Sequence, residues 1–165
     1  FYGRACDGNH FAGCLNLGMM YELGTGVTQD FNRAATLYQQ ACDGTNFSGC
    51  NRLGMLYENG MGVTKDSNRA FELYRKACKG DNFSGCNHLG LILENYTGLG
   101  RDTVAAVNLY QKACDGDYAP GCYNLARMVE AGTGVAKDPV RALELFKKSC
   151  DSGNSDGCAA MSRLK

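Results

Sequence analysis

The segment Cys42–Cys50, with the sequence CDGTNFSGC, recurs four more times along the chain with small changes. All ten cysteines of the 165-residue protein lie in these five segments. Seven residues separate the two cysteines of a pair, and each pair begins 36 residues after the previous one. The other copies are Cys6–Cys14, Cys78–Cys86, Cys114–Cys122 and Cys150–Cys158. A fixed period of this length predicts an array of structural repeats.

Two helical patterns fill each repeat, and the second repeat shows them most clearly. Its first helix is predicted over Ser48–Asn59 and its second over Ser67–Cys78, because apolar residues recur there every three to four positions. Gly60–Val63 should turn the chain between them, and Asp66 is expected to cap the second helix. The apolar stripes are Cys50, Leu53, Gly54 and Tyr57, then Ala70, Leu73, Tyr74, Ala77 and Cys78. The opposite face of the second helix, predicted to be solvated, carries Arg69, Glu72, Arg75 and Lys76. The aspartates equivalent to Asp66 are Asp30, Asp102 and Asp138.

These patterns predict a single all-α domain over residues 1–165, a solenoid of antiparallel helical hairpins. A hairpin of this size buries little by itself, so its stability must come from its neighbours. Gly54 and Ala77 are small enough to let helices approach closely. The predicted units are a half-unit at 1–13, full units at 14–49, 50–85, 86–121 and 122–157, and a capping half-unit at 158–165.

The regular cysteine pairs favour a disulfide framework in an oxidising compartment. Each pair joins the end of a second helix to the start of the next first helix, across a short turn that places the two ends side by side. Two alternatives remain at this point, namely reduced cysteines in a cytosolic core and metal sites, although each segment offers only two thiols. The predicted disulfides are Cys6–Cys14, Cys42–Cys50, Cys78–Cys86, Cys114–Cys122 and Cys150–Cys158.

Charge balance and hydropathy argue against two classes of function, nucleic-acid binding and membrane insertion. Seventeen basic and seventeen acidic residues cancel, which argues against binding to nucleic acid or to an anionic lipid surface. No run of residues is long and apolar enough to insert into a membrane. The chain opens inside a repeat, because residues 1–6 align with the ends of later second helices, and it therefore reads as a piece or processed form of a longer array.

The stretches LGMLYENGMGVTKD (residues 53–66) and RAFELYRKACKG (residues 69–80) resemble the Sel1-like repeat family, whose members are related to tetratricopeptide repeats. The recurring cysteine pairs are similar to those of the secreted cysteine-rich Sel1-like proteins of Helicobacter. The resemblance implies a right-handed superhelix that acts as a protein-binding scaffold, secreted or periplasmic, without a cofactor. It also implies an alternative, a penicillin-binding protein or weak β-lactamase with a β-lactam or peptidoglycan fragment as ligand. A mitochondrial intermembrane-space assembly factor is similar as well, which gives a second possible location.

Resemblance to tetratricopeptide arrays also implies a concave surface lined by one arc of the first helices, the first, fifth and eighth residues after the cysteine. This arc differs most between repeats, whereas a position needed only for stacking should look alike each time. Amides can hold a peptide backbone, methionines supply an adaptable floor, and tyrosine and arginine are enriched at binding hot spots. An ordinary solvated face is the alternative. The predicted binding residues are Met19, Asn51, Met55, Asn87, Tyr123 and Arg127.

The eighth position is a glutamate in all four repeats, which suggests a structural role. Glu58 is expected to bond the glycine turn or to pair with Arg69 of the second helix. Glu22 and Glu130 have arginines at equivalent places, Arg33 and Arg141. The third repeat departs from the pattern, as local drift, at Leu93, Tyr96 and Ala105.

The sequence offers little for catalysis. A serine β-lactamase needs a serine with a lysine three residues further along one helix face. Only Ser162 and Lys165 have that spacing, at the last four residues and without further motifs, so the match reads as chance. Two isolated histidines cannot form a metallo-hydrolase site. No catalytic residue, metal site or cofactor is therefore predicted.

Overall fold

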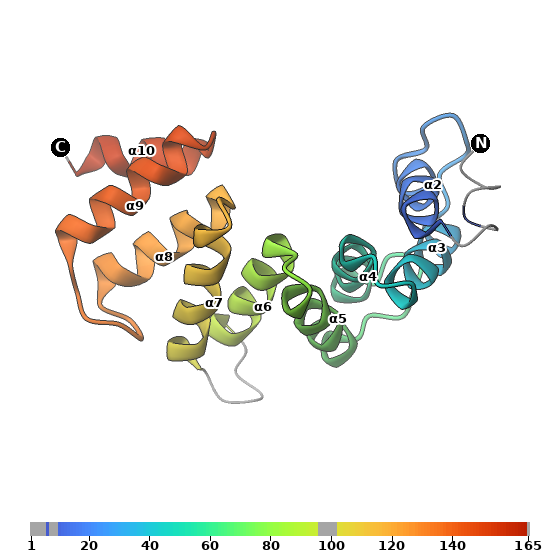
Figure 1. The fold of residues 1–165 in the computed structure, drawn as a ribbon, viewed down its shortest axis with the longest axis horizontal. Coiled ribbons are helices and arrows are strands. Elements are labelled where there is room, and N and C mark those ends of the chain that lie inside the picture. Colours follow the sequence, from blue (N-terminus) through green and yellow to red (C-terminus); the bar gives the residue numbers. More distant parts are fainter. Residues whose placement is uncertain (1–5, 7–9, 96–101, 165) are drawn as a thin grey trace. The chain divides into compact units, whose positions relative to one another are not determined.

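The computed structural model describes Cys6, residues 10–95 and residues 102–164, and every regular element in these ranges is a helix (Figure 1). The helices are α2 (Phe11–Leu23), α3 (Phe31–Asp43), α4 (Phe47–Asn59), α5 (Ser67–Lys79), α6 (Phe83–Asn95), α7 (Thr103–Asp115), α8 (Ala119–Ala131), α9 (Pro139–Asp151) and α10 (Ser155–Arg163). The bounds of α4 and α5 agree with the two helices predicted for the second repeat to within a residue at each end. The all-α hairpin architecture predicted from periodicity is confirmed.

Side-chain caps start most of these helices. The Asp66 carboxylate accepts a hydrogen bond from the backbone N–H of Arg69 at 2.9 Å, as predicted for the second helices. The same bond is made by Asp30, Asp102 and Asp138. The first helices α4, α6 and α10 use asparagine instead, a signal that sequence reasoning missed, whereas α2 and α8 begin without a side-chain cap. The capping asparagines are Asn46, Asn82 and Asn154.

Disulfides connect the end of each second helix to the start of the next first helix. The Cα–Cα distances are 4.6 Å for Cys6–Cys14, 4.6 Å for Cys42–Cys50, 4.4 Å for Cys114–Cys122 and 4.5 Å for Cys150–Cys158. Cys78 and Cys86 are also disulfide-bonded, so no described cysteine is free. The predicted disulfide framework is confirmed.

In the segments 42–50, 78–86 and 114–122, the turn contains a glycine followed by a residue with left-handed backbone, whereas in the segment 150–158 Gly153 is itself left-handed. In the first such turn that the structure describes, Thr45 has a φ of 63° while the preceding Gly44 has a φ of −80°. Gly44 is therefore not required by backbone conformation. A Cβ placed there would lie 2.0 Å from the ring of Phe11, so close packing explains this glycine.

Hairpin packing depends on a glycine of the first helix that faces an aromatic ring of the second. A Cβ at Gly54 would lie 2.7 Å from the Tyr74 ring, and Tyr74 is fully buried. The close approach predicted for Gly54 is confirmed. Gly18 with Tyr38 and Gly90 with Tyr110 repeat the arrangement. The fourth repeat changes both partners, to Ala126 and Phe146.

Consecutive repeats are also tied together at two backbone positions. Gly62, in the loop before α5, has a φ of 67°, and a Cβ there would lie 2.3 Å from the carbonyl carbon of Phe31 at the start of α3. At the other end of the helices, the Lys76 ammonium donates to the carbonyl oxygen of Cys42 at 3.0 Å. These contacts fix the second repeat's α5 against the first repeat's α3 at both ends.

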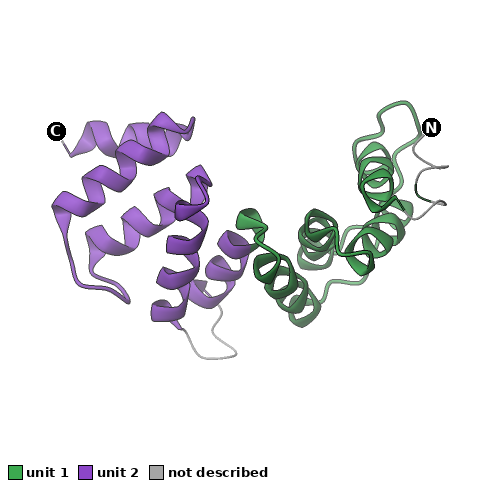
Figure 2. Cartoon of the chain, in the orientation of Figure 1, with its two compact units in different colours: residues 1–85 green, residues 86–165 purple. Residues whose placement is uncertain are grey.

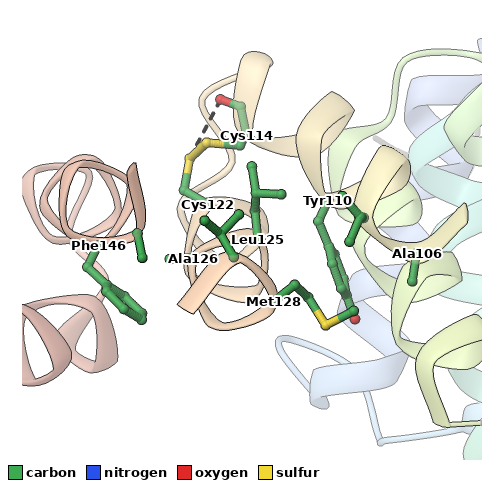
Figure 3. Packing of buried hydrophobic residues seen from close by; sticks show 11 residues of the cluster. Ala106, Tyr110, Cys114, Cys122, Leu125, Ala126, Met128 and Phe146 are labelled. Atoms are coloured by element: carbon green, nitrogen blue, oxygen red, sulfur yellow. Dashed lines mark hydrogen bonds between the residues drawn. A yellow bond between two sulfur atoms is a disulfide. The ribbon is translucent and has the colours of Figure 1, made fainter. Parts of the chain in front are cut away.

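The chain divides into two compact units, residues 1–85 and 86–165 (Figure 2). Each has its own apolar core of alanine, leucine, cysteine and aromatic side chains. The first core is Ala34, Ala35, Tyr38, Cys42, Cys50, Leu53, Leu56, Leu73 and Ala77. The second is Ala106, Val107, Tyr110, Cys114, Cys122, Leu125, Ala126, Met128, Val129, Ala142 and Phe146 (Figure 3). The expected single domain over residues 1–165 stays a prediction.

The third repeat departs from the common sequence pattern but keeps two of its structural features. Leu93 of this repeat packs against the core of the second unit, and Asp102 still caps α7 through the backbone N–H of Ala105. Tyr96 and Lys165 lie outside the described residues. Among the described helices, none has the length and apolar character needed to cross a bilayer.

Candidate functional site: a groove between α8 and α10

A groove of about 360 Å³ lies in the second unit and is lined by residues of α8, α9 and α10. Tyr123 and Phe146 form its aromatic part, with ring centroids 5.8 Å apart and planes tilted by 55°. Phe146 belongs to α9 and is almost fully buried. The lining residues are Tyr123, Arg127, Glu130, Phe146, Asp156, Ala159, Ala160 and Arg163.

Helical periodicity places these side chains on facing stripes. Tyr123, Arg127 and Glu130 are at i, i+4 and i+7 of α8, and Asp156, Ala160 and Arg163 have the same spacing on α10. Both stripes therefore line one groove, and the short side chains at 159 and 160 keep its α10 wall low.

Two arginines of the groove are held by glutamates while remaining accessible. Arg127 donates to Glu94 at 2.9 Å, and its side chain is 41% exposed against 11% for Glu94. Arg163 donates to both carboxylate oxygens of Glu130, at 2.8 and 2.9 Å. A guanidinium has five N–H donors in a fixed plane, so each arginine keeps donors for a ligand after pairing with its glutamate.

The glutamates form a repeated network whose partners differ from those predicted. Glu58 accepts a hydrogen bond from the Tyr74 hydroxyl at 2.6 Å, Glu94 from Tyr110 at 2.7 Å, and Glu22 from Tyr38. Burial, followed by the hydrogen bond to the glutamate, raises the pKa of all three tyrosines, so the phenols stay protonated donors. The structural role expected for the glutamates is thus confirmed.

The arginines expected to pair with these glutamates bind elsewhere. Arg33 donates to the Tyr21 hydroxyl at 3.1 Å, and Arg141 donates to Gln111 at 2.7 Å. Glu22 instead forms an ion pair with Arg52 of the following repeat, and Glu130 forms the equivalent ion pair with Arg163. The predicted pairs Glu58–Arg69, Glu22–Arg33 and Glu130–Arg141 are wrong, because a glutamate on the last turn of a first helix points toward the next first helix and the buried tyrosine.

The structure places the predicted tyrosine and arginine in the groove and the predicted methionines outside it. Tyr123 and Arg127 come together in the α8–α10 groove. Met19 and Met55 are partly buried, and Met19 packs against the core of the first unit.

The two asparagines of the predicted set are buried and already hydrogen-bonded. Asn51 is 7% exposed and donates to the Ser84 hydroxyl at 3.3 Å. Asn87 is 4% exposed and accepts from Asn124 at 2.9 Å. A peptide would have to compete with these bonds, so their predicted role in binding stays a prediction that the geometry makes costly.

Sequence reasoning missed the contribution of α10 to the groove. Ala159 and Arg163 are the first and fifth residues after Cys158, the same positions that were singled out after the earlier cysteines. Extending that rule into the final half-unit would have found both. Phe146 and Asp156 carried no such signal, because their part in the groove depends on how α9 and α10 pack.

Of the Ser162–Lys165 spacing noted in the sequence, the structure describes only the serine. The Ser162 hydroxyl donates to the Cys158 carbonyl at 3.0 Å on the exposed side of α10, a bond typical of a serine within a helix. No group of three or more His, Cys, Asp or Glu side chains in the described ranges could hold a metal ion. The titratable carboxylates among the groove's lining residues are Glu130, which is paired with Arg163, and Asp156.

Helical hairpins that repeat every 36 residues and are linked by disulfides place this chain among the helical repeat proteins. The Sel1 repeat family model matches residues 12–46, 48–82, 84–118 and 119–154. The chain therefore belongs to the Sel1 repeat family, which confirms the resemblance seen in the sequence.

Solved structures with the same fold come from several bacteria. The chain is 27% identical to a protective antigen of uropathogenic Escherichia coli, with a TM-score of 0.90 over 99% of this chain and 35% of that one. It is 25% identical to a Sel1 repeat protein from Oxalobacter formigenes, with a TM-score of 0.91 over 98% of this chain and 64% of that one. It is 30% identical to Helicobacter pylori cysteine-rich protein B, with a TM-score of 0.64 over 80% of this chain and 95% of that one. No curated protein matches the chain.

Proposed function

We propose that this chain is a protein- or peptide-binding scaffold and that the α8–α10 groove is a binding site. The observation that carries the proposal is the groove itself, which brings together an aromatic pair, two accessible arginines and two small residues on facing helix stripes. Tyrosine and arginine dominate the energetics of many protein interfaces. The relatives' fold supports a binding role, because helical repeat arrays present extended surfaces between their repeats.

The groove suits an extended segment more than a compact small molecule. From Tyr123 to Glu130, α8 rises by about 10 Å, which is the length of about three residues of extended peptide. Tyr123 can pack against an apolar side chain, while Arg127 and Arg163 can donate to backbone carbonyls or to a carboxylate. Asp156 supplies a hydrogen-bond acceptor near the start of α10, away from the two arginines. The groove therefore offers both donors and acceptors to a peptide backbone.

A secreted or periplasmic location is part of the proposal. Disulfides persist in oxidising compartments and are rare where thiols are kept reduced, and every described cysteine is in one. The measurement is the number of cysteines that an alkylating reagent modifies when the protein is denatured and isolated from its native source in its presence, counted by mass spectrometry. Unmodified, disulfide-bonded cysteines support the location, and ten alkylated cysteines would contradict it.

The binding site can be tested with a variant that fills the groove. Short random peptides are selected on the oxidised protein, and the affinities of the selected peptides are measured by calorimetry. Ala159→Gln, which lengthens an exposed side chain of the α10 wall, should weaken binding by about tenfold or more, and Tyr123→Ala should do the same.

Ser162→Gln provides the matched control, because Ser162 is also exposed on α10 but does not line the groove. This variant should bind the selected peptides as the parent protein does. Equal binding by Ala159→Gln and the parent would show that the peptides bind elsewhere and would overturn the assignment of the groove.

A further inference from the structure

A second and larger groove, of about 640 Å³, lies in the first unit between the second helices α3 and α5. Its floor includes Leu73, which is 5% exposed, and Cys42, which is 1% exposed. Its walls carry the charged residues that the sequence placed on a solvated helix face. The lining residues are Gln39, Cys42, Asp43, Arg69, Glu72, Leu73, Arg75, Lys76 and Lys79.

Two positive charges at the ends of this groove are not used within the described part of the protein. Arg75 pairs with Glu72, and Lys76 donates to the Cys42 carbonyl. Among the described residues, none accepts a hydrogen bond from the guanidinium of Arg69 or from the ammonium of Lys79. Both side chains lie on the groove wall of α5, ten residues apart, which corresponds to about 15 Å along the helix.

The second unit provides an internal comparison at the same place in its repeats, 72 residues further along. There Arg141, the counterpart of Arg69, donates to Gln111 at 2.7 Å. Lys148 pairs with Asp117 at 2.9 Å, and Asp151 stands where α5 has Lys79.

The α3–α5 groove and the equivalent surface of α7 and α9 therefore differ in net charge although both lie between consecutive second helices. The α3–α5 groove carries four cations and two carboxylates, which are Arg69, Arg75, Lys76, Lys79, Asp43 and Glu72. The counterparts in the second unit balance, with three of each, namely Arg141, Lys147, Lys148, Asp115, Glu144 and Asp151. Features required for stacking should be common to both units, so stacking does not account for the positive excess in the first.

We propose that the α3–α5 groove binds an extended acidic peptide segment, with two carboxylates about four residues apart. Four residues of extended chain span about 13 Å, close to the separation of Arg69 and Lys79 along α5. Gln39 and the apolar floor can accommodate the intervening backbone and side chains. The site is separate from the α8–α10 groove, so the two proposals can fail independently.

The spacing of the charges argues for a peptide over other anions. A single phosphate or sulfate would need cations that converge, whereas Arg69 and Lys79 stand at opposite ends. A uniform polyanion would meet the carboxylate of Glu72 between the two cations and that of Asp43 at the Lys79 end of the groove, which disfavours nucleic acid. A peptide can place neutral residues there and acidic residues at the two ends.

The test uses fluorescent peptides of one composition and the oxidised full chain, with anisotropy as the readout. One peptide has two glutamates about four residues apart, a second has them adjacent, and a third has glutamine in both places. The spaced peptide should bind best, and its affinity should fall between about 50 and 200 mM salt. Equal binding by the adjacent or the glutamine peptide would overturn the proposal.

Two charge-reversal variants show where the spaced peptide binds. Lys79→Asp should lower the affinity for the spaced peptide by about tenfold or more. Lys147→Asp makes the same change in net charge at an exposed position of α9 and should change the affinity by less than about twofold. Equal loss in both variants would indicate general charge attraction and overturn the site.

Circular dichroism melting confirms that both charge-reversal variants are folded. A single-stranded oligonucleotide serves as the competing probe in the same assay. If the oligonucleotide binds, loses affinity in Lys79→Asp and displaces the peptide at lower concentration, then the groove binds polyanions and the peptide assignment is wrong.

Discussion

Adjacent residues in the cysteine-flanked turn meet different physical demands. Thr45 adopts the left-handed conformation although it is β-branched, which costs about 1 to 2 kcal/mol. Gly44 has an ordinary backbone, but the Phe11 ring occupies the space that a side chain would take. The conformational requirement and the packing requirement thus fall on two consecutive residues.

Opposite effects are therefore expected from two neighbouring substitutions. Thr45→Gly should raise the free energy of unfolding by up to about 1 kcal/mol, since relief of the left-handed strain exceeds the entropy cost of glycine. Gly44→Ala should lower it by about 1 to 3 kcal/mol, because the Phe11 ring must move. Urea unfolding of the oxidised protein measures both. A destabilised Thr45→Gly variant or a neutral Gly44→Ala variant would contradict the assignment.

At the same scale, the glutamate network shows what could be predicted and what could not. Four copies at one position indicated a structural role for residues such as Glu58. The partner, Tyr74, lies 16 residues away and is an apolar-stripe residue by its spacing, so nothing in the pattern marked its hydroxyl as a donor. Repetition revealed that the position matters, but not which tertiary contact makes it matter.

Among the elements, α10 depends most on its disulfide. It is shorter than the other described helices, at nine residues, and it packs on α9, to which Cys150–Cys158 connects it. It also forms one wall of the α8–α10 groove. An isolated helix of this length is unstable in water, so α10 needs both the covalent link and the packing on α9.

Removal of that link should loosen α10 selectively. In the double variant Cys150→Ala, Cys158→Ala, loss of about 2 to 3 kcal/mol of loop-closure stabilisation should speed amide exchange in α10 by about 30- to 150-fold. Hydrogen exchange followed by mass spectrometry measures this. The control is Cys42→Ala, Cys50→Ala, which should leave α10 exchange unchanged. Unaltered exchange of α10 in the first variant would show that packing alone holds it.

Element boundaries were more predictable than the groove that the elements form. The apolar period, the glycine turns and the capping aspartates were enough to locate α4 and α5, because these signals are local in the sequence. The groove required the positions of α8, α9 and α10 relative to one another. Phe146 shows the difference, since it stands where the second repeat has Tyr74 of the apolar stripe, whereas its contact with Tyr123 in the groove depends on how α9 packs.

For the whole molecule, the sequence predicts one folding domain. Repeats 50–85 and 86–121 follow the same 36-residue pattern as the others, and repeat arrays gain stability from each neighbour. We therefore expect one calorimetric unfolding transition for the oxidised chain, with equal calorimetric and van't Hoff enthalpies. Two resolved transitions, one of them reproduced by residues 1–85 alone, would show instead that the two compact units fold independently.

The contacts between consecutive repeats also constrain how such a chain can change during evolution. Gly62 must meet the backbone of Phe31 while Lys76 reaches the Cys42 carbonyl at the other end of the helices. A single inserted residue between these points would put both contacts out of register. The length of the array can therefore grow or shrink by duplication or loss of whole repeats, whereas the interior of a repeat tolerates exchange of side chains but little change in length.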